Sequence, residues 1–242
     1  MRQATLLLAL ALAAAPSAEA RERGDVDFPE KLPESPKERR CCGYPLGEYK
    51  LSFYWLSYER DYAAEAYDTP VFTIEGWLVG MFPRRFVEEL TMEGTAVLAD
   101  GRVLNYAGRC RYGTGICFQA CDRAAFPVGI GVRGRSLVPY RSVAVDPAVV
   151  PIGEPLYFPE LDGIELPDGT LHDGCVRADD QGGAIRKREI DFFVASYDEF
   201  KKIADAIWWR MKVTPHVEEP RCRYLLDTPP SPPSPPPPIA RR

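Results

Sequence analysis

Short apolar runs separated by turn residues recur along this chain, and they limit its fold more than any other feature of the sequence. The clearest example is GTAVLADGRVLNYAG (Gly94–Gly108), where two apolar runs flank Asp100-Gly101, a dipeptide typical of β-hairpin turns. Comparable runs occur from Tyr49 to Ser196, with further turns at Asp168-Gly169. Many short strands and few helices predict a mainly β protein built as a small barrel.

Two segments have helical spacing instead. In RRFVEELTM (Arg84–Met92), Phe86 and Leu90 lie four residues apart. The stronger segment is SYDEFKKIADAIWWRM (Ser196–Met211), which opens with a capping box of the form S-x-x-E. Its apolar residues recur at intervals of three and four, which predicts a C-terminal amphipathic helix packed on the barrel. These residues are Tyr197, Phe200, Ile203, Ala204, Ile207 and Trp208.

The composition is that of a globular protein. Of the 242 residues, 45% are hydrophobic and 27% are charged, and the formal net charge is −5. No basic run is long enough for a nucleic-acid footprint, so nucleic acid is not an expected partner. Histidine occurs only at His172 and His216, which argues against a histidine-based triad or a zinc site.

The N-terminal part of the sequence predicts export. Residues 1–20 combine a positive start, an apolar run and an A-x-A site ending at Ala20, which are the features of a secretory signal peptide cleaved near Ala20. The apolar run is too short to span a bilayer, and no later run is long enough. We therefore expect a periplasmic or extracellular protein without a membrane-spanning segment.

Two further segments are predicted to flank the folded domain. Residues 21–40 are charged and interrupted by prolines, which predicts a linker. Residues 227–242 contain PPSPPSPPPP, which predicts a disordered, proline-rich tail, and the sequence identifies no partner for it. The folded domain is expected between residues 41 and 226.

The seven cysteines are interpreted from the expected export, because disulfides are the default in an oxidising compartment. The count is odd, so one thiol is left over or pairs between chains, and the pairing stays open. No C-x-x-C motif occurs, so neither a metal nor another cofactor is expected. The cysteines are Cys41, Cys42, Cys110, Cys117, Cys121, Cys175 and Cys222.

Each of three aspartates, taken alone, has an ordinary structural explanation. Asp191 interrupts the apolar run I-D-F-F-V, although Asp is disfavoured in strands, and alternation alone would place it on a solvent face. Asp180 precedes Gln181-Gly182-Gly183 and could cap a turn through its own backbone. Asp146 precedes Pro147 and has the appearance of an ordinary strand end.

Together the three acids fall into two motifs, SVAVDPAVVPIG (Ser142–Gly153) and ADDQGGAIRKREID (Ala178–Asp191). These motifs resemble the 3D domain, which is named for three aspartates and is shared by the MltA-type lytic murein transglycosylases and the stationary-phase-survival proteins. The family pattern is S-x-A-V-D-P-x-x-x-P-L-G followed by A-x-D-T-G-G-A-I-K-G-x-x-I-D. Gln181 stands where the family has Thr, and Arg186-Lys187 stands where it has Lys-Gly.

The resemblance implies a six-stranded double-psi β-barrel with a groove that binds glycan. By motif, Asp191 matches the catalytic acid, and Asp180 and Asp146 match two supporting aspartates. The implied activity is that of a peptidoglycan lytic transglycosylase, which cleaves the β-1,4 bond between N-acetylmuramic acid (MurNAc) and N-acetylglucosamine (GlcNAc) and forms 1,6-anhydro-MurNAc. The implied partner is the peptidoglycan glycan strand.

The chemistry of that reaction needs one carboxyl that begins protonated, because no water takes part and the same group acts first as acid and then as base. A free Asp, with a pKa near ~3.9, is ionised at neutral pH. Burial among Ile190, Phe192 and Phe193, together with the like charge of Asp180, would raise the pKa of Asp191.

Other polar residues are candidates for binding sugar. Glu93, Thr95 and Tyr106 lie on the Gly-Thr hairpin, and Tyr140 and Arg141 flank the first aspartate strand. Core packing or turn formation explains the three hairpin residues equally well. Two other functions stay open: a non-catalytic, expansin-like module that binds or loosens the cell wall, and a disulfide-rich structural protein of the envelope.

Overall fold

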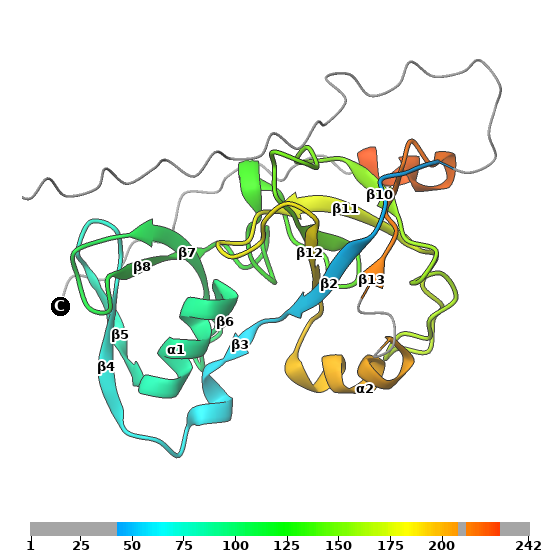
Figure 1. Ribbon diagram of the computed structural model, residues 1–242. Coiled ribbons are helices and arrows are strands. Elements are labelled where there is room, and N and C mark those ends of the chain that lie inside the picture. Colours follow the sequence, from blue (N-terminus) through cyan, green and yellow to red (C-terminus); the bar gives the residue numbers. More distant parts are fainter. Residues whose placement is uncertain (1–42, 208–211, 228–242) are drawn as a thin grey trace, which may run out of the picture. The chain divides into compact units, whose positions relative to one another are not determined.

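The computed structural model describes residues 43–207 and 212–227. The expected signal peptide (1–20), the linker (21–40) and the proline-rich tail beyond residue 227 lie outside the described residues. Within them the chain is mainly β, as predicted, with strands β1 to β14 arranged in three sheets (Figure 1).

The largest sheet has eight strands in the order β1-β14-β10-β11-β9-β12-β2-β13. The pairs β9–β11 and β2–β12 are parallel, and the other pairs are antiparallel. Its strands are β1 (Tyr44–Pro45), β2 (Tyr49–Tyr54), β9 (Ser142–Ala144), β10 (Pro155–Tyr157), β11 (Cys175–Asp180), β12 (Glu189–Phe193), β13 (Lys212–Val213) and β14 (His216–Val217).

This sheet has more strands than the six expected from the family resemblance. Three of the eight strands, β1, β13 and β14, are two residues long and lie at the two ends of the sheet, and the other five are longer. Figure 1 shows β2 beside β12, although the two strands are far apart in the sequence.

The other two sheets are formed by strands between Ser57 and Cys121. One sheet has the order β3-β6-β7-β8, and the other is the hairpin β4–β5. The predicted hairpin around Asp100-Gly101 is confirmed, since β6 pairs antiparallel with β7 and Gly101 has the positive φ of 86° that such a turn requires. The strands are β3 (Ser57–Tyr58), β4 (Tyr67–Phe72), β5 (Leu78–Pro83), β6 (Thr95–Val97), β7 (Val103–Arg109) and β8 (Ile116–Cys121).

Two α-helices are present where helical spacing predicted them. Helix α1 (Arg84–Glu93) buries Phe86, Val87 and Leu90 and ends at Gly94. Helix α2 (Tyr197–Ile207) begins after Ser196, whose Oγ accepts a hydrogen bond from the Glu199 N–H at 3.2 Å. Three short 3₁₀ helices complete the elements discussed here: η1 (Glu59–Tyr62), η2 (Val132–Gly134) and η4 (Pro220–Leu226).

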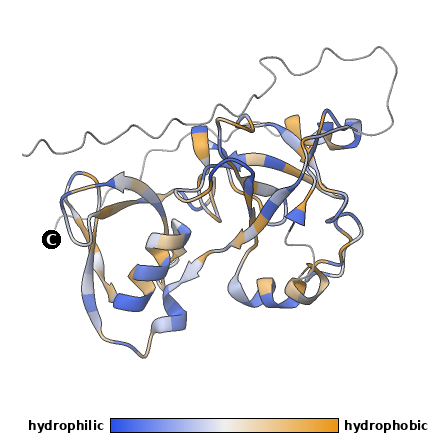
Figure 2. Cartoon of the chain, viewed as in Figure 1, coloured by the Kyte–Doolittle hydropathy of each residue, from blue (hydrophilic) through white to orange (hydrophobic). Residues whose placement is uncertain are grey.

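Helix α2 carries both hydrophobic and hydrophilic residues (Figure 2), as an amphipathic helix does. Ile203 and Ile207 are buried in the same cluster as the core of the eight-stranded sheet, and Phe200 packs against that cluster. The predicted helix continued to Met211, but positions 208–211 lie outside the described residues. Strands β13 and β14 and helix η4 follow α2, so the helix is not the last element.

Two disulfides connect elements of this fold, Cys110–Cys117 and Cys175–Cys222. The second one joins β11 to η4. Cys121 is a buried free thiol, and burial raises its pKa to about 12, which keeps it in the unreactive protonated form. Cys41 and Cys42 lie outside the described residues. In the described part of the chain, no helix combines the length and apolar character needed to cross a membrane.

Candidate active site

Two of the three motif aspartates lie in one row across the eight-stranded sheet. Asp180 on β11 is in register with Ala144 on β9, Ala144 is in register with Asp191 on β12, and Asp191 is in register with Ser52 on β2. Residues in register on neighbouring strands point to the same face of a sheet. The small Ala144 side chain therefore separates two carboxyl groups that share one face.

A β-bulge places Asp180 in this row. Between Ala178 and Asp180 the pairing of β11 with β9 shifts, so that two residues of β11 stand opposite one residue of β9. Such a bulge redirects a side chain. Asp180 thereby joins the row, while the adjacent Asp179 makes its contacts elsewhere.

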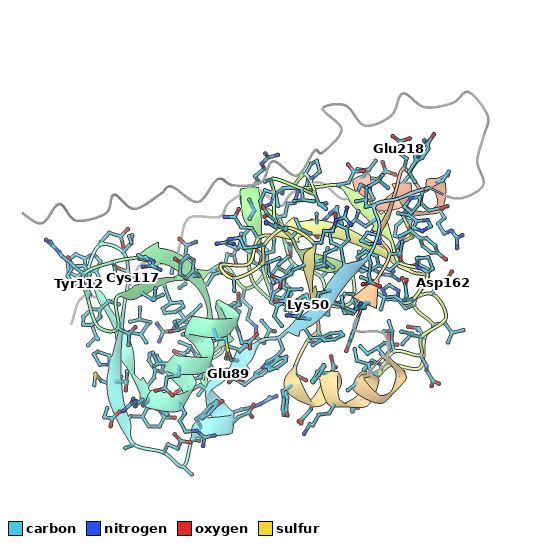
Figure 3. All side chains as sticks on the ribbon, viewed as in Figure 1. Lys50, Glu89, Tyr112, Cys117, Asp162 and Glu218 are labelled. Atoms are coloured by element: carbon cyan, nitrogen blue, oxygen red, sulfur yellow. A yellow bond between two sulfur atoms is a disulfide. The ribbon has the colours of Figure 1, made fainter. Side chains whose placement is uncertain are left out.

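Asp191 is held in apolar surroundings, which explains why an acid occurs inside an apolar strand. Its neighbours Ile190 and Phe192 are buried, and its own Oδ1 is buried with no hydrogen-bond partner among the described residues. Burial raises the pKa of Asp191 to about 6. The Glu189 carboxylate contributes to this rise, while the Ser52 side chain and the charge of Lys50, which Figure 3 labels on β2, oppose it.

Asp180 has a similar environment with more hydrogen-bond donors. Burial raises its pKa to about 7, and the charges of Asp179 and Asp191 act in the same direction. The Gln181 N–H donates to Asp180 Oδ1 at 2.8 Å, and the Tyr54 hydroxyl acts on Asp180 as a second donor group without forming a well-aligned bond. These donors favour the ionised form and lower the pKa. Asp191 thus raises the pKa of Asp180, and because repulsion between two carboxylates is mutual, this coupling agrees with the expectation that Asp180 raises the pKa of Asp191. The Glu189 carboxylate acts on Asp191 in the same direction.

Asp146 lies at a different place and has a different environment. Its Oδ2 accepts a hydrogen bond from the Lys187 N–H at 2.8 Å, and its Oδ1 accepts one from the Ala148 N–H at 3.0 Å. Both bonds lower the pKa of Asp146, so it is ionised at neutral pH. Asp146 thus ties its own strand end to the loop between β11 and β12, which connects the other two motif aspartates.

Lys187 explains one departure from the family pattern. It has a φ of 54°, in the left-handed region, at the position where the family has Gly. Arg186 compensates by holding the same loop, since its guanidinium donates to the carbonyl oxygens of Ile185 at 2.7 Å and Gly183 at 2.8 Å. The loop therefore closes without the glycine.

Glu93 is the candidate binding residue that the structure brings near the acid pair. It ends α1, and its Oε2 accepts a hydrogen bond from the Trp55 N–H at 3.1 Å. Burial raises the pKa of Glu93 to about 7, and the charges of Asp191 and Glu89 raise it further. A third carboxyl with a raised pKa therefore lies within electrostatic reach of Asp191.

The other four candidate binding residues have different contacts. The Thr95 hydroxyl donates to Asn105 Oδ1 at 2.9 Å, which fixes the pairing of β6 with β7. Tyr106 is 45% exposed on β7. The Tyr140 hydroxyl donates to Glu199, and the Arg141 guanidinium donates to Asp173 and to the Cys175 carbonyl oxygen.

Sequence reasoning missed Ser52 and Tyr54, which both lie on β2 and lower the pKa values of Asp191 and Asp180, respectively. Their alternation along β2 predicts that they share a face of the sheet. No local signal, however, predicts that β2 pairs with β12, which follows it by more than 130 residues.

Sequence reasoning also missed a buried charge network next to the acid pair. Asp179 accepts hydrogen bonds from Arg177 through both carboxylate oxygens, at 2.6 and 3.3 Å, and from the Ser142 hydroxyl at 2.7 Å. Arg177 also donates to the Leu225 carbonyl oxygen of η4. This network is structural, because each carboxylate oxygen already has its donors.

Within residues 43–207 and 212–227, no group of three or more His, Cys, Asp or Glu side chains is arranged to hold a metal ion.

Residues 141–213 match the family model of the 3D domain. The match includes β9, β11 and β12 and all three motif aspartates, so this part of the chain is a 3D domain and the resemblance seen in the sequence is confirmed. No curated protein matches the chain.

Among the solved structures that are similar to the chain are three lytic transglycosylases. They are E. coli MltA with bound chitohexaose (13% identity, TM-score 0.47, covering 62% of this chain and 65% of that chain), a membrane-bound lytic murein transglycosylase from Agrobacterium tumefaciens (17%, 0.41, 62% and 55%), and the lytic transglycosylase LtgG of Burkholderia pseudomallei (21%, 0.33, 70% and 65%). The chain thus spans less than two thirds of each of these proteins. Because every identity is below 25% and every TM-score below 0.5, no activity and no residue role is transferred from them.

Proposed function

We propose that the chain is a peptidoglycan lytic transglycosylase with Asp191 as its catalytic acid and base. One observation carries the proposal: Asp191 lies inside an apolar strand of a 3D domain with a buried carboxyl oxygen that has no hydrogen-bond partner among the described residues. A buried polar group without a partner needs an explanation, and catalysis is one of the few available.

The proposed reaction uses the glycan's own hydroxyl in place of water. The protonated Asp191 gives its proton to the oxygen that joins MurNAc C1 to GlcNAc C4, and the C1–O bond breaks. The C6 hydroxyl oxygen of the same MurNAc forms a bond to C1, and its proton passes to the Asp191 carboxylate. The products are a free GlcNAc 4-hydroxyl and a 1,6-anhydro-MurNAc end, and Asp191 is protonated again.

The raised pKa values support this role. Asp180 and Asp191, with pKa values of about 7 and about 6, titrate as a pair, so the pair retains one proton in a range where ordinary Asp is fully ionised. With the proton on Asp191, the Asp180 carboxylate stabilises the positive charge that develops on the sugar ring. In this proposal Asp146 is a supporting residue that holds the β11–β12 loop.

Four finer statements belong to the same proposal. The strands around the two parallel pairs form the six-stranded double-psi barrel, and Glu93, Thr95, Tyr106, Tyr140 and Arg141 line the approach of the glycan strand. The chain is exported after cleavage near Ala20 into an oxidising compartment, which the two disulfides support. Residues 41–226 are the folded domain.

The test is digestion of purified sacculi followed by mass spectrometry of the released muropeptides. Wild-type protein should release 1,6-anhydro-muropeptides, and Asp191→Asn should reduce the rate by about 10⁴-fold or more, since general acid catalysis alone contributes about 10²–10⁴. Asn keeps the shape of Asp but cannot give up a proton. Asp198→Asn, which changes an exposed acid on α2, is the matched control and should leave the rate unchanged.

Two results would overturn the proposal. Sacculus binding without anhydro product between about pH 4 and 8 would leave the expansin-like binding module as the function. Full activity of Asp191→Asn would show that the catalytic carboxyl is a different one.

A further inference from the structure

Tyr54 occupies a position next to the acid pair that the proposed mechanism does not use. It lies on β2 two residues beyond Ser52 and in register with Phe193, so it shares the face of the sheet that carries Asp191. Its ring packs on Phe193 with a centroid distance of 4.9 Å and belongs to the cluster that contains Ala144. The side chain is therefore fixed over the row that joins the two carboxyls.

The hydroxyl of Tyr54 is buried within electrostatic reach of Asp180, Asp191 and Asp179. Tyr54 is only 7% exposed, and no described residue forms a well-aligned hydrogen bond with its buried hydroxyl oxygen. Asp180 is the acid that acts on the pKa of Tyr54 both by its charge and as a side-chain hydrogen-bonding group. Burial and then the charges of Asp180, Asp191 and Asp179 raise the pKa of Tyr54 well above its ordinary value. The phenol thus stays protonated and can only donate to an ionised carboxylate.

The charged groups around the site come from four elements. Asp179 on β11 is neutralised by Arg177 and lies 3.9 Å from Arg135. Glu189 on β12 and Lys50 on β2 act on Asp191 with opposite signs and form an ion pair of 3.6 Å with each other. Glu93 at the end of α1 is coupled to Asp191. Tyr54 is the neutral donor in this set that reaches Asp180 through its side chain.

We propose that Tyr54 is a positioning residue of this site, whose hydroxyl donates to the Asp180 carboxylate and so shifts the shared proton toward Asp191. The inference rests on the proposed function for its catalytic meaning. A donor stabilises the ionised form of the carboxyl that accepts its bond. Stabilisation of the Asp180 anion raises the share of the single-proton form in which the proton is on Asp191, from which the leaving oxygen of the glycan can receive it.

Removal of the Tyr54 hydroxyl should shift the shared proton of the acid pair from Asp191 toward Asp180. Without the donor, the Asp180 carboxylate is less stable and its pKa rises. A hydrogen bond to a charged group is about twice as strong as one between neutral groups, so the expected upward shift is about one pH unit or more. More of the single-proton form then has its proton on Asp180, the optimal rate falls, and the acid limb of the pH–rate profile moves to higher pH.

The experiment compares Tyr54→Phe with Tyr58→Phe in the full chain. Each variant removes one hydroxyl oxygen from a tyrosine, but the Tyr58 hydroxyl donates to the Ala195 carbonyl oxygen at 3.4 Å and not to the acids. Carboxyl ¹³C chemical shifts of Asp180 and Asp191 are followed from pH 4 to 9, and the pH–rate profile on sacculi is measured in parallel. A third variant, Asp180→Asn with Tyr54→Phe, separates the bond from general packing effects.

The expected result is an upward shift of the Asp180 titration in Tyr54→Phe, no shift in Tyr58→Phe, and no effect of Tyr54→Phe on Asp191 once Asp180 is Asn. An unchanged Asp180 titration in a folded Tyr54→Phe protein would overturn the inference. So would the same shift in both tyrosine variants. The carboxyl titrations need no turnover, so they decide where the proton lies even if sacculi yield no anhydro product and the proposed function fails.

Discussion

Asp179 and Asp180 are adjacent on β11, yet the structure gives them opposite surroundings. Asp179 is 1% exposed and has Arg177 and Ser142 as donors to both of its oxygens. Asp180 faces Asp191 across Ala144, and within the described residues it forms no ion pair. Asp179 is paired with a cation and is therefore a structural group. Asp180 has no such cation in the described part of the chain and can retain a proton near neutral pH.

The physical reason is the balance between desolvation and compensation. A buried carboxylate costs several kcal/mol unless a cation and hydrogen bonds replace its water. The bidentate Arg177 supplies that compensation to Asp179. Asp180 receives only neutral donors, so burial dominates and its pKa rises. One bulge in one strand therefore separates an ion-paired acid from an acid with a raised pKa.

The largest stability change should come from breaking the paired acid. Asp179→Asn leaves Arg177 buried without its countercharge, and loss of one partner of a buried pair costs about 3–5 kcal/mol. Urea denaturation at pH 7.5 measures this loss. Asp100→Asn, which breaks the exposed pair with Arg102, is the control and should cost at most about 1 kcal/mol. Equal losses in the free energy of unfolding of the two variants would contradict the structural role of the Asp179–Arg177 pair.

The two disulfides should contribute different amounts to the free energy of unfolding measured by urea denaturation. Cys175–Cys222 closes a separation of 47 residues and anchors η4, whose Leu225 carbonyl oxygen accepts from Arg177, whereas Cys110–Cys117 closes a separation of 7. Loop-closure entropy predicts a loss of about 4 kcal/mol when the first is replaced by two alanines and about 2 kcal/mol for the second. The reverse order would show that the link to η4 does not support the Arg177 network.

Asp180→Asn should stabilise the protein above neutral pH. The folded pKa of about 7 lies above the ordinary 3.8, so the folded state binds a proton more tightly than the unfolded state. The resulting stability is fully present below about pH 4 and is lost as the pH rises through about 7. The variant should therefore exceed wild type by about 1–3 kcal/mol at pH 8, with a flatter stability profile from pH 4 to 8.

Asp146→Asn is the matched control for that experiment, with the opposite sign. Backbone N–H donors lower the pKa of Asp146, so this carboxylate stabilises the fold above its ordinary pKa of 3.8 and loses that effect as the pH falls. Its variant should be less stable than wild type at pH 8. A stability gain in Asp146→Asn, or none in Asp180→Asn, would contradict the assignment of unlike environments to the motif aspartates.

The smallest change should come from the loop between Asp180 and Asp191. Lys187→Gly removes a side chain from a residue with a φ of 54°, in the left-handed region. Glycine relieves the strain of that conformation but gives the unfolded chain more entropy, so the net gain in stability should be about 0.5–1 kcal/mol. Arg186→Gly is the neighbouring control and should destabilise, because Arg186 donates to backbone carbonyls and its φ is not positive. Thermal denaturation distinguishes the two outcomes.

Much of the fold could be predicted from the sequence because its signals are local. The turn at Asp100-Gly101 predicted the β6–β7 hairpin, and apolar spacing predicted α1 and α2. The two aspartate motifs predicted the 3D domain that the family model matches. Each of these signals depends on residues within a few positions of one another, where backbone propensity and side-chain periodicity act directly.

The tertiary structure decided everything that depends on residues far apart in the chain. Only the pairing of β12 with β2 brings Ser52 and Tyr54 to Asp191, and only the bulge in β11 sends Asp179 and Asp180 to different partners. The disulfide pairing, which the cysteine count left open, was likewise decided by the fold. The physical reason is that a carboxyl's charge state depends on burial and on nearby donors and charges, and these come from strands that the sequence does not place side by side.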